Sequence, residues 1–179
     1  RLGLRYVRGL REEAGRRMER LRPFASADDL VRRAGLRSDE LARLAELGAL
    51  GSLGLERRAA LWEVERAARP AGPLYSSLDA IPDLSPLPPM TPAEALVADY
   101  DGAGLSLGPH PMTFHRARLE RFGVARAADL PGMRHGAPVR VAGAVVVRQR
   151  PGTAKGFVFL NLEDETGLVN VVVPPPLFH

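Results

Sequence analysis

The sequence predicts an α+β fold in which a helical part comes first and an antiparallel sheet comes last. Up to residue 69, apolar residues recur at intervals of three and four, which is typical of amphipathic helices. Seven prolines then fall between residues 70 and 92 and favour an extended linker. Beyond residue 137, β-branched runs alternate with glycine-containing turns and predict strands.

Composition indicates the class of partner. The 179 residues carry a net charge of +4 with a sequence pI of about 10.3, which suits a polyanionic partner. The sequence has no cysteine, which excludes disulfides and cysteine-based zinc sites, and we expect a cytoplasmic protein. No signal peptide and no apolar run of about eighteen residues occurs, so no membrane partner is expected. The sequence begins without methionine, and we expect a piece of a longer protein.

The first helical hairpin is expected around the turn Gly9-Leu10-Arg11, with a helix beginning at Glu12. A helix, a tight glycine turn and a second helix make up a helix-hairpin-helix, in which backbone N–H groups hold a DNA phosphate without reading sequence. Arg11 stands where the second glycine of the usual hairpin belongs, and its guanidinium can reach the same phosphate. Together with Arg8, this turn is a candidate DNA site. The alternative is an ordinary αα-hairpin.

A second hairpin is expected around Gly35 and Arg37, where Gly-Leu-Arg occurs again. Before it, Ser26 is expected to cap a short helix, with Asp29 at the third helical position. After it, Ser38 is the expected N-cap of the following helix. Two facing hairpins of this kind form one compact domain with two phosphate sites, which we expect over residues 1–69.

Residues 70–92 are the expected proline-rich linker, and residues 93–136 are an expected helical connector to the sheet. Thr91 and Glu94 form a capping box at the start of the connector helix. The glycine-rich stretch that follows lacks the Lys-Ser/Thr of a phosphate-binding loop. His110, between two prolines, is expected to make a local hydrogen bond, and no metal site is expected because no carboxylates cluster near it.

Residues 137–179 are expected to form the first strands of an oligonucleotide-binding (OB) barrel. Three apolar runs, Val139–Val147, Phe157–Leu162 and Leu168–Val173, alternate with turns as in a β-meander. The loop between the first two runs is basic and is followed by aromatic residues, a combination that OB barrels use to bind phosphates and to stack bases. The candidate DNA-binding residues here are Arg148, Arg150, Lys155, Phe157 and Phe159. The alternative is a solvated basic hairpin whose phenylalanines belong to the core.

The end of the chain resembles the OB-fold segment near the C-terminus of bacterial C-family (DnaE-type) DNA polymerases. The resemblance rests on V-A-G-A-V-V-V-R-Q-R-P-G-T-A-K-G-F-V-F-L-N-L-E-D-E-T-G-L-V-N-V-V-V, in which R-Q-R-P-G-T-A-K-G-F is most similar to the error-prone branch. Upstream, L-A-E-L-G-A-L-G-S-L-G resembles the closing helix of their helix-hairpin-helix domain. The resemblance implies a C-terminal fragment of such a polymerase with an incomplete barrel, since a five-stranded OB barrel needs two more strands.

The resemblance also implies a function in translesion synthesis and damage-induced mutagenesis. The two hairpins would hold duplex DNA behind the active site, and the barrel loop would meet the single-stranded template. Such binding is independent of sequence and steeply weakened by salt. Mutasome accessory proteins are further implied partners. The sliding clamp is at most an indirect one, because Gly72-Pro73-Leu74-Tyr75 keeps only the apolar-aromatic part of a clamp-binding peptide.

The chain itself is expected to be catalytically inactive. C-family catalysis needs three palm carboxylates that hold two Mg²⁺ ions, and no Asp-x-Asp cluster of that kind occurs here. We therefore assign no catalytic residue, no metal ligand and no cofactor to this chain, with Mg²⁺ belonging to the palm domain of the full polymerase. Two alternative functions stay open: an OB module that mainly docks protein partners of the mutagenic polymerase complex, and a stand-alone OB-containing repair factor.

Overall fold

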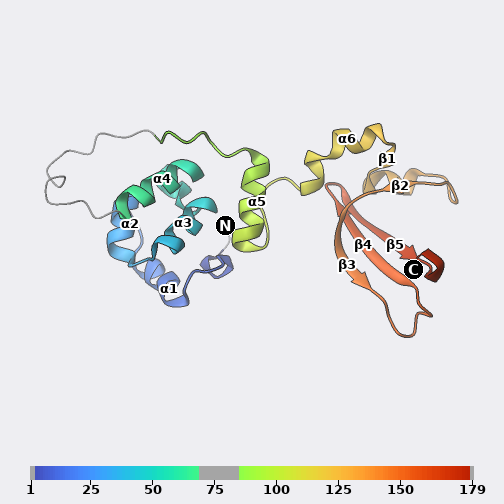
Figure 1. Ribbon diagram of the computed structural model, residues 1–179, viewed down its shortest axis with the longest axis horizontal. Coiled ribbons are helices and arrows are strands. Elements are labelled where there is room, and N and C mark those ends of the chain that lie inside the picture. Colours follow the sequence, from blue (N-terminus) through green and yellow to red (C-terminus); the bar gives the residue numbers. More distant parts are fainter. Residues whose placement is uncertain (1–2, 69–84, 178–179) are drawn as a thin grey trace. The chain divides into compact units, whose positions relative to one another are not determined.

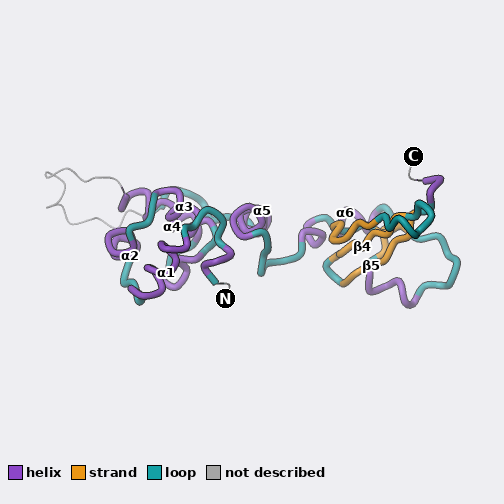
Figure 2. Tube along the Cα trace, turned by 90° about the horizontal axis from the view of Figure 1, so that it is seen from below, coloured by secondary structure: helices purple, strands orange, loops and turns teal. Residues whose placement is uncertain are grey.

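A computed structural model describes residues 3–68 and 85–177 (Figure 1). The chain divides into two compact units, Arg1–Gly108 and Pro109–His179. The predicted α+β class is confirmed, because helices make up the first unit and the strands lie in the second (Figure 2). The division falls inside the predicted connector, residues 93–136. Most of the predicted linker, with the clamp-like peptide at residues 72–75, lies outside the described residues.

Five α-helices occur in the described part of the first unit. They are α1 (Glu12–Leu21), α2 (Ala27–Ala34), α3 (Ser38–Glu46), α4 (Arg57–Ala68) and α5 (Pro92–Ala103), with short 3₁₀ turns η1 (Leu4–Tyr6) and η2 (Ala49–Leu53). Two predicted caps are confirmed: the Ser26 side chain accepts from the Asp29 N–H, and Thr91 and Glu94 form a reciprocal capping box. These caps satisfy N–H groups that have no partner within the helix.

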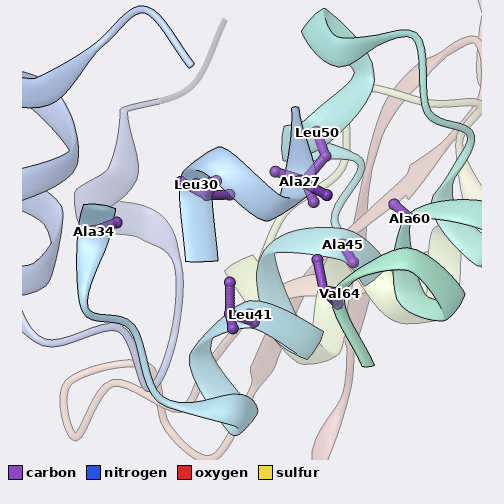
Figure 3. Close-up of a cluster of buried hydrophobic side chains, with 8 residues drawn as sticks. All are labelled: Ala27, Leu30, Ala34, Leu41, Ala45, Leu50, Ala60 and Val64. Atoms are coloured by element: carbon purple, nitrogen blue, oxygen red, sulfur yellow. The ribbon is translucent and has the colours of Figure 1, made fainter. Parts of the chain in front are cut away.

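The core of this unit lies between α2, α3 and α4, where small and branched side chains converge (Figure 3). The buried residues are Ala27, Leu30, Ala34, Leu41, Ala45, Leu50, Ala60 and Val64. Burial of a leucine or valine side chain stabilises a fold by roughly 1.5–3 kcal/mol, so this cluster holds α2, α3, η2 and α4 together. The many alanines allow the helices to approach closely.

Helix α5 belongs to the first unit, although the linker separates it from α4 in sequence. It packs on α3, and the backbone N–H of Arg8 donates to the carbonyl of Gly102 at 2.7 Å. The Arg57 guanidinium donates to the Asp99 carboxylate at 2.7 Å and also to the carbonyl of Ala95 at 3.2 Å. These contacts with the turn at Arg8, with α3 and with α4 make α5 a part of the helical unit.

The second unit contains a three-stranded antiparallel sheet in the order β3-β4-β5 and a short parallel pair, β1-β2. Its elements are η3 (Pro111–Phe114), α6 (Arg116–Arg121), β1 (Val124–Ala125), η4 (Ala127–Gly132), β2 (Arg140–Val141), β3 (Ala144–Gln149), β4 (Val158–Asp164), β5 (Gly167–Val173) and η5 (Pro175–Leu177). The strands that the structure describes form an open sheet and no closed barrel.

The first predicted strand, Val139–Val147, is divided in two at Gly143. A Cβ at this position would lie 2.7 Å from the carbonyl oxygen of Glu163, so only glycine allows the two backbones to approach this closely. The division separates β2 from β3. A β-bulge between Val145 and Val147 then adds a further irregularity to the β3–β4 pairing.

Candidate nucleic-acid interface

The turn at Gly9 has the geometry that a tight hairpin needs. Gly9 adopts a φ of +83°, in the left-handed region that favours glycine, and a Cβ there would meet open space. Helix α1 follows, with Arg11 as its N-cap in an extended conformation. The glycine is therefore required by the backbone conformation of the turn, while the space outside it is free for a ligand.

Arg11 does not point toward that space. Its guanidinium donates to both carboxylate oxygens of Glu40, from Nε to Oε1 at 2.8 Å and from Nη2 to Oε2 at 2.8 Å. Its backbone N–H donates to Glu40 Oε1 at 3.0 Å, and Nη2 also donates to the Gly35 carbonyl at 3.3 Å. The candidate residue Arg11 thus links the first turn to the second, and its charge is balanced within the protein.

Glu40 itself is almost fully buried, with 1% of its surface exposed. The hydrogen bonds from the Arg11 side chain lower the pKa of this carboxyl to about 2, against the effect of burial, and the backbone N–H of Arg37 adds to the lowering. A buried carboxylate requires such donors, because an uncompensated charge in this position would destabilise the fold strongly. Glu40 is therefore ionised wherever the domain is folded near neutral pH.

The second turn is built around Gly35, which has a φ of +61° at the C-terminus of α2. The guanidinium of Arg17, from α1, lies beside this glycine, 3.0 Å from where a Cβ would be. Arg37 is the N-cap of α3, so the expectation that Ser38 caps this helix was wrong. The reason is that Glu40, at the third helical position, accepts the Arg37 N–H at 2.8 Å and so begins the helix one residue earlier. The Arg37 side chain is exposed.

Arg8 lies at the C-terminus of α5. Its Nη1 donates to the carbonyl oxygens of Tyr100 at 3.2 Å and Asp101 at 3.4 Å, and its guanidinium covers Gly104, the left-handed residue that ends the helix. A cation is favourable at this position because the last carbonyls of a helix carry partial negative charge. The structure thus brings Arg8 of the first turn close to α5, and Gly35 of the second turn close to Arg17.

The candidate residues of the sheet lie on two different faces. Phe159 pairs with Gln149 on one side and with Val172 on the other, so these three side chains share one face. Arg148 pairs with Leu160 and therefore points to the opposite face. Sequence reasoning grouped the cations and aromatics of this hairpin into a single surface, whereas the strand register separates Arg148 from Phe159.

The β3–β4 loop lies at the end of the sheet and carries the remaining candidates. Lys155 has a φ of +47°, unusual for a residue with a side chain, and Gly156 follows with a φ of +88°. Lys155 and Arg150 are exposed, and Phe157 and Phe159 expose 37% and 38% of their surfaces. A loop with accessible cations and two half-exposed rings beside it can hold a phosphate and stack a base.

His110 makes the predicted local hydrogen bond, accepting the Met112 N–H at its Nδ1 over 3.2 Å. Within residues 3–68 and 85–177, no group of three or more His, Cys, Asp or Glu side chains is placed to hold a metal ion. No helix in these ranges is both long and apolar enough to cross a bilayer.

Sequence reasoning missed Glu40, Arg17 and Arg116 as important residues. Glu40 stands three residues after an N-cap, a spacing that predicts a capping box, and this signal was available. Its burial and its bonds to Arg11 were not, because they depend on how α1 meets α3. Arg116 is buried against Asp164 and Glu165 of the β4–β5 turn, and no sequence pattern indicates this pairing.

Comparisons with known proteins add two findings. Residues 1–60 match a family model described as a helix-hairpin-helix motif. The chain is also 46% identical to the error-prone DNA polymerase of Ralstonia nicotianae, over 100% of this chain, and 45% identical to that of Pseudomonas aeruginosa, over 97%. The error-prone DNA polymerase of Rhodopirellula baltica is 44% identical over 97% of this chain. The chain spans 17%, 17% and 16% of the lengths of these relatives, respectively.

Proposed function

We propose that this chain, which is similar along its whole length to error-prone DNA polymerases, is a DNA-binding C-terminal segment of such a polymerase, active in translesion synthesis and damage-induced mutagenesis. Nucleotidyl transfer would belong to the complete enzyme, whose palm carboxylates hold Mg²⁺. This chain would contribute DNA binding and no catalysis. We further propose that the polymerase works in the cytoplasm, where bacterial DNA is replicated.

The observation that carries the proposal is the pair of Gly-Leu-Arg turns joined in one helical unit. Both glycines are left-handed, and each turn leads into the N-terminus of a helix, α1 or α3. Such turns bind duplex phosphates without reading bases. Arg37 is exposed and is proposed to contact a phosphate directly, while Arg8 and Arg11 are proposed to act mainly by holding the turns in place.

The β3–β4 loop is proposed to bind the single-stranded template. Arg150 and Lys155, together with Arg148 from the opposite face of β3, would attract the backbone, and Phe157 and Phe159 would stack on bases. Because these contacts are to charge and to ring faces, the proposed binding does not depend on base sequence.

The open sheet also favours a second candidate, docking of a protein partner. The register places Val147, Leu168 and Val172 on one face of the sheet, where they expose 37%, 61% and 53% of their surfaces. Exposed apolar residues gathered on one face of a sheet are typical of an interaction surface. In this version, mutasome accessory proteins would bind the sheet, and the sliding clamp would be reached through them.

Fluorescence anisotropy separates the two candidates. The 179-residue chain is titrated against labelled single-stranded, duplex and primer-template DNA over a salt series, alongside an Arg148→Glu/Lys155→Glu variant. DNA binding predicts a steep negative slope of log K against log salt and a shallower slope for the variant with single strands. Anisotropy that stays flat at low salt, with circular dichroism showing a folded chain, would instead assign the sheet to protein docking.

A further inference from the structure

Glu40 contacts both Gly-Leu-Arg turns, and we infer that it is a positioning residue that couples them into one surface for duplex DNA. The inference rests on the proposed function and deepens it. It concerns how the two turns act together, and it explains why a buried carboxylate stands beside a surface meant for a polyanion.

The geometry joins the turns through the two oxygens of one side chain. Oε1 of Glu40 accepts two hydrogen bonds from Arg11, and Oε2 accepts one from the Arg11 side chain and one from the Arg37 N–H. Arg11 also donates to the carbonyl of Gly35, so the first turn contacts the second directly as well. Every one of these bonds connects to a Gly-Leu-Arg residue, at 9–11 or at 35–37.

Such a connection matters for binding, because phosphates along a duplex stand at fixed separations. Two turns that are held rigidly can bind two phosphates without losing further conformational entropy. Two loosely placed turns bind as separate weak sites. Replacement of a buried ion pair by apolar residues is often neutral for stability. The Arg11–Glu40 pair is therefore better explained by the placement of the turns than by stability alone.

Glu40→Gln gives a test in which simple electrostatics and positioning predict opposite changes in the affinity for duplex DNA. Removal of a negative charge and release of Arg11 would tighten DNA binding if the carboxylate only repelled phosphates. If Glu40 positions the turns, the variant should bind duplex DNA about tenfold more weakly, with a salt slope shallower by about 1, because one phosphate contact is lost. Circular dichroism and the fluorescence of Trp62 establish that the variant is folded.

Arg11→Lys is the second variant, in case Glu40→Gln does not fold. It keeps the charge and the backbone N–H but loses the bidentate fork, so electrostatics predicts unchanged affinity and positioning predicts weaker binding. The matched control is Asp29→Asn. Asp29 also stands at the third position of a helix, α2, but its carboxylate accepts from the neighbouring Ala25, Arg32 and Arg33 and makes no bond to either Gly-Leu-Arg turn.

The outcomes are distinct. Weaker duplex binding and a shallower slope for the Glu40 or Arg11 variant, with the Asp29 variant close to wild type, support the inference. Equal or tighter binding by a folded Glu40→Gln overturns it while leaving the DNA-binding function in place. A wild-type chain that binds no duplex DNA at low salt overturns the proposed function and the inference together.

Discussion

The backbone N–H of Arg8 donates to the carbonyl oxygen of Gly102 at 2.7 Å and joins the start of the helical unit to its last helix. Gly102 is buried, and a Cβ there would lie 2.8 Å from the Leu47 side chain of the segment after α3. A glycine inside α5 thus allows the helix to lie close to α3 and to the first turn at the same time. The position of the first turn consequently depends on α5.

Gly102→Ala is expected to destabilise the first unit. The new methyl group overlaps Leu47, and overpacking of this kind costs about 1–3 kcal/mol, offset by less than about 1 kcal/mol of improved helix propensity. Urea unfolding followed by Trp62 fluorescence measures the change. Gly51→Ala is the control, because a Cβ at Gly51 meets nothing within 4 Å. Equal stability of the two variants would contradict the packing of α5.

Glu40 is expected to make the first unit sensitive to acid. Its pKa is lowered from 4.5 to about 2 in the folded state, chiefly by the Arg11 side chain, so the unfolded state binds the proton more readily. The resulting stabilisation, about 3 kcal/mol, is complete above pH of about 4.5 and is lost as pH falls toward 2. Glu40→Gln should remove this part of the pH dependence. Parallel curves of unfolding free energy for wild type and variant between pH 5 and 2.5 would contradict the contribution of Glu40 to acid sensitivity.

Arg116→Met is expected to destabilise the second unit by about 3 kcal/mol, because removal of one partner leaves a buried charge unpaired. Arg116 exposes 8% and Asp164 5% of their surfaces, and they pair at 3.3 Å. The measurement is the rate of hydrogen exchange in β4 and β5, which should be faster in the variant. Arg126→Met, which removes an exposed pair with Glu120, should change stability by less than about 1 kcal/mol. Similar hydrogen-exchange rates in the two variants would show that the buried Arg116 pair does not stabilise the second unit.

Arg37→Ala and Arg8→Ala are expected to affect different properties. Arg37 uses its backbone in the fold and exposes its side chain, so its loss should weaken duplex binding, with a salt slope shallower by about 1 and stability unchanged. Arg8 holds the end of α5, so its loss should lower the melting temperature by a few degrees. Anisotropy and thermal unfolding of both variants make the comparison. Unchanged duplex affinity for Arg37→Ala would show that Arg37 of the second turn does not contact duplex DNA.

Phe159→Ala is expected to weaken single-strand binding by about 1–3 kcal/mol, the usual contribution of one stacked base, and to leave duplex binding unchanged. Phe122→Ala is the matched control, since Phe122 is 58% exposed and lies outside the sheet. Anisotropy with single-stranded and duplex DNA provides the measurement. An equal effect of both substitutions would show that Phe159 has no special role.

Local signals in the sequence were enough for much of the fold. The cap at Ser26, the capping box at Thr91 and the turn at Gly35 were predicted correctly because each depends on residues within a few positions. The strands β4 and β5 were predicted within one or two residues of their ends, since β-branched runs favour extended backbone wherever they occur.

The candidate site was less predictable, because its geometry depends on contacts between distant segments. The sequence suggested Arg11 as a phosphate ligand, but the fold brings Glu40 of α3 to it, 29 positions further along the chain. Arg148 and Phe159 lie close in sequence, yet the register of β3 with β4 places them on opposite faces. A shift of the pairing by one residue would reverse this placement.

The sequence by itself determined the class of the fold, the two glycine turns and the order of helices before strands, because backbone preferences and apolar periodicity act over short distances. Only the tertiary structure decided which arginines are exposed and which are bound within the protein. That division depends on the helix packing that buries Glu40 and on the docking of α5 against Arg8, and both join parts of the chain that are far apart in sequence.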